Sequence, residues 1–191
     1  MPKRGDKSDR WKKSTIPLSP GHKWQCKPGN QLFLADRGAV SFEFPQGWVI
    51  RHNQVDTITL HDRPPPDDSA RVSLTIFRLP PVAGGWSQLP LDQMLKSKPP
   101  KDDDDRGEMV VHDVARPGLE IVWGEKQPHP DPENGKLIRC RHIVARARGI
   151  QALISFDVYV DADARFAAAW DDLLQTLQLG IPRDFQGEAG N

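Results

Sequence analysis

The clearest pattern in the chain is an alternation of apolar and polar residues that gives way to a helical repeat. Every even-numbered residue from 152 to 160 is apolar, and Gln151, Ser155 and Asp157 lie at odd positions. This period of two predicts a strand with one buried face. Further along, the apolar residues fall three and four apart, which is the spacing of one helix face: Phe166, Trp170, Leu173, Leu174 and Leu177. A strand with one apolar face followed by a helix with one apolar stripe indicates a sheet covered by that helix.

The ends of this helix carry recognisable signals. Asp161 or Asp163 is expected to cap the first turn, because a carboxylate accepts hydrogen bonds from its free N–H groups. Gly180 followed by Pro182 is expected to end the helix.

Eight earlier segments show the strand pattern or are bounded by turn residues typical of strands. They are residues 31–35, 39–44, 48–50, 57–61, 71–79, 108–115, 118–126 and 136–148. The first two are expected to form a hairpin in which Gly38 takes the positive φ that the turn needs. A short helix is predicted to start at Pro90, with Leu91, Met94 and Leu95 on one apolar stripe.

No internal repeat and no Gly/Ser-rich linker divides the chain. We therefore expect three parts: a disordered basic arm over residues 1–21, a single α+β domain over residues 22–181, and a flexible tail over residues 182–191.

The predicted strand over residues 136–148 breaks the alternation. Arg139 and Arg141 are odd-numbered, whereas Arg146 and Arg148 are even-numbered. In a regular strand the two pairs point to opposite faces of the sheet. Either the second face is also covered, or one extra residue near positions 142–144 forms a β-bulge that restores the phase. We favour the bulge, which brings the four arginines to one face.

The totals are those of an ordinary soluble chain. It has 191 residues, of which 37% are apolar and 27% charged, and no apolar run is long enough to span a bilayer. The 26 basic and 26 acidic residues cancel, but residues 1–13 hold six basic against two acidic side chains, which leaves the remainder with a net charge of −4. The arm is expected to be a solvated terminus; the alternative is a tether to nucleic acid or an anionic surface.

The start of the chain and its cysteines favour a cytoplasmic location. No continuous apolar segment follows the basic start, so it does not have the pattern of a secretory signal. Cys26 and Cys140 lie far apart, which fits two free thiols in a reducing compartment better than a disulfide framework.

The order of elements, with five short segments, resembles the PsbP-like superfamily. The segments are "VSFEFPQGW", a strand ending "FRLP", "IVWGEKQ", the arginine-bearing hairpin and the closing "AAWDDLLQTLQLG". This superfamily includes the extrinsic PsbP protein of photosystem II, a nuclear Ran-GTPase-binding release factor and bacterial domains of unassigned role. The resemblance covers residues 30–180 and implies an α+β fold, an antiparallel sheet sandwiched between helices. It also implies a binding protein without catalytic residues, and the missing targeting leader favours the bacterial branch.

Motifs for metal, nucleotide or nucleophilic chemistry are weak or missing. His22, Cys26, Cys140 and His142 could supply a tetrahedral zinc set, but the spacing within each pair is not that of a common zinc motif. The acidic run at residues 102–105 lacks the alternating ligands of a calcium loop. The sequence contains no Gly-x-Ser-x-Gly, Gly-x-Gly-x-x-Gly or Walker A motif. We expect no catalytic residue, no metal and no cofactor.

The residues best suited to bind a partner are the arginines of the long hairpin. Arg139, Arg141, Arg146 and Arg148 could form a row for carboxylate or phosphate groups, or could instead pair with acids on neighbouring strands. Trp48 is the aromatic anchor expected beside them, with Trp86 and Trp123 as further candidates if they are exposed. The preferred hypothesis is a cytoplasmic, non-catalytic binding or adaptor domain with a protein partner. The alternative is an enzyme whose pocket is built from dispersed His, Asp and Arg residues.

Overall fold

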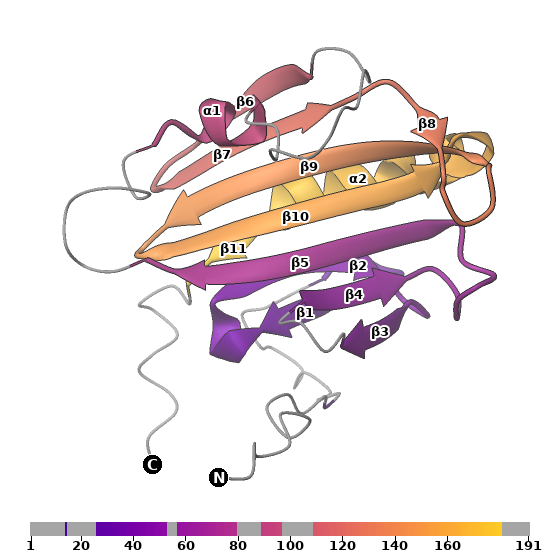
Figure 1. Ribbon diagram of the computed structural model, residues 1–191. Helices are drawn as coiled ribbons and strands as arrows, with labels where there is room; N and C mark the ends of the chain where they lie inside the picture. The colour runs from indigo at the N-terminus through magenta and orange to yellow at the C-terminus, as the bar shows by residue number, and fades with distance from the viewer. Residues whose placement is uncertain (1–13, 15–25, 53–56, 80–88, 97–108, 181–191) are drawn as a thin grey trace, which may run out of the picture.

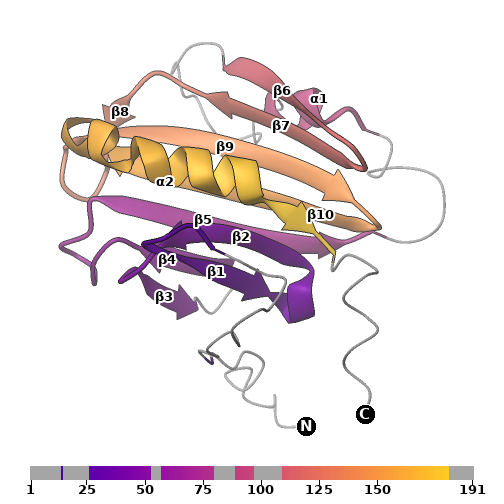
Figure 2. The same ribbon diagram turned by 180° about the vertical axis from the view of Figure 1, so that it is seen from behind.

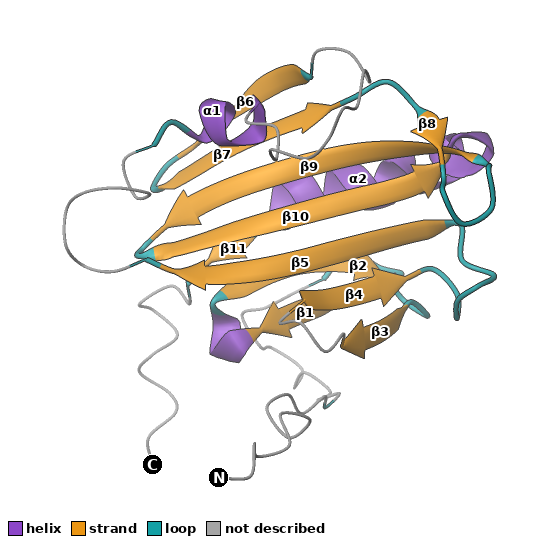
Figure 3. Cartoon of the chain, viewed as in Figure 1, coloured by secondary structure: helices purple, strands orange, loops and turns teal. Residues whose placement is uncertain are grey.

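The computed structural model describes residues 14, 26–52, 57–79, 89–96 and 109–180. Within them the chain forms two antiparallel sheets and two α-helices (Figures 1 and 3). The large sheet has the order β3 (Val49–His52), β4 (Thr57–His61), β5 (Ala70–Arg78), β10 (Ile150–Tyr159), β9 (Leu137–Ala147), β7 (Leu119–Glu125) and β6 (Val110–Arg116), with β8 (His129–Pro130) paired to β9. The small sheet has the order β1 (Asn30–Ala35), β2 (Val40–Pro45) and β11 (Gln178–Leu179).

The helices lie on opposite faces of the large sheet. Figure 2 shows α2 (Asp163–Thr176) in front of β9 and β10, with the small sheet on the same side, whereas α1 (Leu91–Lys96) lies behind β7. The predicted α+β architecture, an antiparallel sheet between helices, is therefore confirmed. None of the described helices is both long enough and apolar enough to span a bilayer.

The main core lies between the large sheet, α2 and the small sheet. The even-numbered side chains of β10 are fully buried there, as their period of two predicts: Ala152, Ile154, Phe156 and Val158. Helix α2 buries Phe166, Ala169, Trp170 and Leu173 against them, while Leu174 is only partly buried. The buried stripe therefore shares Phe166, Trp170 and Leu173 with the predicted one and includes Ala169 in place of Leu174.

A second, smaller core covers the other face of the sheet. Leu91 of α1 packs with Val122 of β7 and Val144 of β9, and Met94 and Leu95 lie against them. This packing explains why residues 136–148 do not alternate simply between apolar and polar, since both faces of β9 are covered at this end of the sheet.

The predicted β-bulge is wrong. Strand β9 pairs without interruption with β10, from Ile138 opposite Tyr159 to Ala147 opposite Ile150. Its register with β7 is equally regular. The other explanation, a covered second face, is the correct one. Arg139 and Arg141 consequently point to the side of α2, and Arg146 points to the side of α1.

The predicted ends of α2 also need correction. Ala162 occupies the N-cap position without a side-chain hydrogen bond, after a 3₁₀ turn over Val160–Ala162. The helix ends at Thr176, before Gly180, because the chain turns at Leu177 into β11. By contrast, the predicted hairpin of β1 and β2 is present, and Gly38 has a φ of +82° in the 3₁₀ turn Asp36–Gly38 between them.

Candidate functional site

Arg139 and Arg141 belong to an ion-pair cluster that fastens the start of α2 to the sheet. The Nη2 atom of Arg141 lies 2.9 Å from Oδ1 of Asp163, and its Nε lies 3.1 Å from Oε2 of Glu125. The Nε of Arg139 lies 3.2 Å from Oδ2 of Asp163, and its Nη1 lies 3.3 Å from Oε1 of Glu125. Two guanidinium groups thus face two carboxylates. Asp163, predicted to cap the helix, binds these arginines instead.

The remaining two arginines lie elsewhere. Arg146 donates from Nη2 to Oε2 of Glu120 at 2.7 Å and from Nη1 to the carbonyl oxygen of Leu89 at 3.1 Å, beside α1. Arg148 lies in the β9–β10 turn, with a φ of +52°, and donates to the carbonyl oxygen of Gly180 at 3.4 Å. The predicted row of four arginines on one face is therefore not formed.

The predicted aromatic anchor, Trp48, is a core residue. Its side chain lies in the main core with the residue 8% exposed, and its ring is 5.8 Å from that of Phe166 and 6.4 Å from that of Phe156. Trp123 is half-buried between the rings of His112, at 4.3 Å, and Trp170, at 5.2 Å. Trp86 lies outside the described residues.

The zinc candidates are only partly described. Cys26 and Cys140 are partly buried and are not joined in a disulfide. His22 lies outside the described residues, as does the acidic run at 102–105. Within the described ranges no three His, Cys, Asp or Glu side chains form a group that could hold a metal ion. Burial raises the pKa of the Cys26 thiol, and the nearby Glu43 carboxylate raises it further. This thiol is therefore a weak nucleophile at neutral pH.

One set of dispersed residues does converge, on β4. His61 Nδ1 lies 2.8 Å from Oδ2 of Asp68, and His61 Nε2 lies 3.0 Å from Oγ1 of Thr59. The order of hydroxyl, imidazole and carboxylate is that of a catalytic triad. However, Thr59 is 4% and His61 6% exposed, so a substrate cannot reach the hydroxyl. The hydrogen bonds satisfy polar groups that folding has buried.

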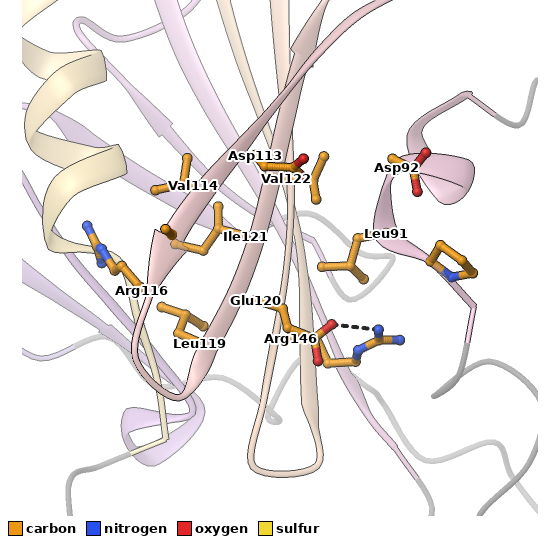
Figure 4. A pocket seen from close by; sticks show the side chains of 12 residues that line it. Leu91, Asp92, Asp113, Val114, Arg116, Leu119, Glu120, Ile121, Val122 and Arg146 are labelled. Carbon is orange, nitrogen blue, oxygen red and sulfur yellow. Dashed lines mark hydrogen bonds and ion pairs between the residues drawn. The ribbon is translucent and has the colours of Figure 1, made fainter.

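A pocket of about 470 Å³ lies where the β6–β7 hairpin meets the start of α1. We call it the edge pocket, because β6 is the last strand of the large sheet. Figure 4 shows its lining on both sides of the hairpin. On the side of α1 lie Leu91, Asp92, Asp113, Glu120, Val122 and Arg146; on the side of α2 lie Val114, Arg116, Leu119 and Ile121.

The two sides of the edge pocket differ in charge. On the side of α1, three carboxylates face one guanidinium group, and that group is bound to Glu120. Asp92 pairs with Lys96 at 3.4 Å, both largely in solvent, where such pairs contribute little. Asp113 is exposed and has no hydrogen bond or ion pair within the described part of the chain. This side is therefore acidic around an apolar floor.

The other side of the edge pocket is apolar. Val114, Leu119 and Ile121 are part of, or pack against, the main core. Arg116, the charged residue here, is committed to the end of α2, where it donates to the carbonyl oxygens of Leu177 and Leu174 at 2.6 and 2.7 Å. Burial lowers the pKa of this guanidinium.

The described residues that line the edge pocket include no Ser, Cys or His, and therefore none of the usual nucleophile and base pairs. Sequence reasoning missed the pocket, because it interpreted Pro90, Leu91 and residues 108–126 only as helix and strand positions. Asp113 and Glu120, polar positions within strands, are the signal that could have indicated it.

The sequence model of the Alr1449 family matches residues 31–182 of the chain. The uncharacterised protein alr1449 of Nostoc sp. strain PCC 7120 is 29% identical over 184 residues, which is 95% of this chain and 93% of the Nostoc protein.

Two solved structures share the fold. Cyanobacterial PsbP (CyanoP) from Synechocystis sp. PCC 6803 superimposes with a TM-score of 0.59 at 12% identity, over 84% of this chain and 100% of CyanoP. A Bacteroides thetaiotaomicron protein superimposes with a TM-score of 0.55 at 14% identity, over 80% of this chain; the chain spans about half, 49%, of that larger protein. The resemblance predicted from sequence is thus confirmed. The chain belongs to the Alr1449 family, and its domain has the PsbP-like fold.

Proposed function

We propose that this chain is a non-catalytic, cytoplasmic binding domain that docks a protein partner at the edge pocket. The observation that carries the proposal is the composition of that pocket: an apolar floor of Leu91 and Val122 beside the exposed carboxylate of Asp113. Apolar contact provides affinity, and unneutralised charge at the rim provides orientation and selectivity. The negative rim repels the phosphates of nucleic acid, so a protein partner fits better.

Two further features support a binding role over an enzymatic one. The hydroxyl, imidazole and carboxylate that do converge, at Thr59, His61 and Asp68, are closed to substrate. The charges of Arg139 and Arg141 are neutralised by Glu125 and Asp163. A cytoplasmic location is supported by two partly buried cysteines that are not joined to each other.

The test is capture of partners from a lysate of the source organism by two matched double variants. Asp113→Lys/Ala115→Lys changes two exposed side chains of β6 at the edge pocket. Asp171→Lys/Ala167→Lys makes the same two substitutions at exposed positions of α2. We expect the first variant to lose a protein that the wild type and the second variant both retain, as judged by quantitative mass spectrometry. If both variants capture the same proteins in the same amounts, the edge pocket is not the docking site.

A further inference from the structure

No described strand pairs with the outer edge of β6. In the order of the large sheet β6 is terminal, and among the described residues only β7 pairs with it. Its exposed side chains include Val110, His112, Asp113 and Ala115. A strand edge of this kind presents unpaired N–H and C=O groups to which another extended chain can add.

The hairpin turn identifies which backbone groups are open. Pro117 and Gly118 form a two-residue loop between the paired residues Arg116 and Leu119. The closing pair of such a hairpin is hydrogen-bonded, and hydrogen-bonded residues then alternate along the strand. The N–H and C=O groups of Ala115, Asp113 and Val111 therefore point away from β7. The side chains of these same residues face α1, because Asp113 lies on that side of the hairpin (Figure 4).

The edge pocket surrounds this edge with two different surfaces. Its α1 side is acidic through Asp92, Asp113 and Glu120, and its α2 side is apolar through Val114, Leu119 and Ile121. A strand added to β6 sends successive side chains to opposite faces of the sheet. The side chains of the added strand would therefore contact carboxylates on the α1 side and aliphatic groups on the α2 side, alternately along the strand.

We propose that the edge pocket binds an extended segment of the partner that adds antiparallel to β6 and alternates basic with aliphatic residues. The proposal rests on the binding function above and assigns its mode and the chemistry of its ligand. In an antiparallel pair, residues that exchange hydrogen bonds have side chains on the same face. The basic residues of the segment therefore supply the backbone bonds to Val111, Asp113 and Ala115, and their side chains reach the carboxylates. The aliphatic residues pack over Val114 and Leu119.

A second copy of β6 fits this edge less well. Two β6 strands paired about their middle would place Asp113 directly opposite the same residue of the other copy, and like charges in that position are destabilising. Asp92 and Glu120 of both copies would add further negative charge to the same interface.

The first experiment measures binding of synthetic peptides to the full chain by isothermal titration calorimetry. The probe is an end-blocked peptide of alternating lysine and valine, of the same seven-residue length as β6. A peptide of alternating glutamate and valine is its matched control. We expect the lysine peptide to bind at least about tenfold more tightly, and this difference to shrink at high salt, because the charges are at the rim. Equal binding of the two peptides would overturn the proposed ligand chemistry.

Backbone methylation of the lysine peptide tests the mode of binding. Methyl groups on the backbone nitrogens of the lysine residues remove the N–H donors that face β6, so binding of the peptide should be lost. The backbone N–H groups of the valine residues point away from β6, so methyl groups on these nitrogens should leave the affinity nearly unchanged. If the lysine-methylated peptide still binds, the segment does not add to the strand as proposed.

Variants of the protein give the reciprocal test. Ala115→Pro removes one open N–H of β6, at an edge position where proline is tolerated, and should reduce affinity about tenfold or more. Ala115→Ser keeps that N–H and should bind as the wild type does. Asp113→Lys should weaken binding about fivefold, within the range of a single exposed ion pair, while Asp171→Lys should not. Unchanged binding by a folded Ala115→Pro chain, or self-association that this variant abolishes, would contradict the proposal.

The two proposals can fail separately. If partner capture depends on Asp113 and Ala115 but neither peptide binds, the docking site stands and the extended basic segment is wrong. If capture does not depend on them and the lysine peptide does not bind, both proposals are wrong.

Discussion

Helix α2, the large sheet and the ion-pair cluster meet at Trp170. It is 6% exposed, and its ring lies 5.2 Å from that of Trp123 and 5.7 Å from that of Phe156. The guanidinium carbon of Arg141 lies 5.4 Å from its centroid, so the ring also contacts a cation that is held by Asp163. The same side chain therefore fills the core and supports the start of its own helix.

Trp170→Ala should lower the free energy of unfolding by about 3–5 kcal/mol, because a buried indole leaves both lost burial and a cavity. Urea denaturation followed by far-UV circular dichroism measures this change. Asp171→Ala, on the exposed side of α2, should change it by about 0.5 kcal/mol or less. A Trp170→Ala chain of near-native stability would show that the indole is not a core residue.

Asp172 marks where residue-level prediction from sequence ends. Its position on the polar side of the helix predicts that replacing it with alanine leaves the free energy of unfolding nearly unchanged. Yet its carboxylate accepts from Lys27 Nζ at 3.1 Å and from Asn30 Nδ2 at 2.9 Å, more than 140 positions away in the chain. The period of α2 shows which side chains avoid the core; it does not show which surface segment lies over them.

At the scale of the element, α2 is held at both ends by arginines from the sheet. Arg139 and Arg141 bind Asp163 in the first turn. Arg116, from the β6–β7 hairpin, donates to the carbonyl oxygens of Leu174, Gln175 and Leu177 at the other end. These carbonyls have no partner within the helix, and a cation is favourable at this end of the helix dipole.

Arg116→Met should destabilise the protein by about 1–3 kcal/mol, because methionine keeps an apolar stem but leaves partly buried carbonyls without a donor. Amide hydrogen exchange should show the loss first in the last turn of α2, and urea denaturation gives its total. Arg51→Met, at an exposed position of β3, is the matched control and should be near neutral. Unaltered exchange at the end of α2 would mean that solvent replaces the guanidinium without cost.

The strands of the two sheets show how much of the fold the local pattern of apolar and polar residues predicts. Strands β4, β5, β7 and β10 lie within one or two residues of their predicted bounds, because alternation reports burial on one face directly. The two-residue strands β8 and β11 were not predicted, since two residues carry no period. The error at β9 has a different origin: α1, encoded some 50 residues earlier, covers its second face, and one strand's pattern does not reveal a distant neighbour.

At the scale of the whole molecule, the two cores have unequal roles. Among the described residues, the main core joins α2 with strands of both sheets, β1, β2, β4, β5, β7, β9, β10 and β11, whereas the second core joins α1 with β6, β7 and β9. The edge pocket lies at the boundary between them, beside the smaller core, where few buried contacts oppose local rearrangement. It is assembled from segments distant in sequence, which is why no single stretch of the sequence predicts it.

Removal of residues 1–20 tests whether the predicted arm belongs to this architecture. Those residues other than 14 lie outside the described part of the chain, and the described main core begins at Phe33 in β1. We expect the melting temperature to stay within about 2 °C of the full chain, since a loss of 1 kcal/mol would shift it by about 2–4 °C at this size. Removal through residue 35 is the positive control: it takes away Phe33, whose ring lies 4.9 Å from that of Phe42, and should unfold the small sheet. A fall of many degrees on the shorter removal would mean that Trp11 or Ile16 docks on the domain. The arm would then be part of the fold and not a free basic terminus.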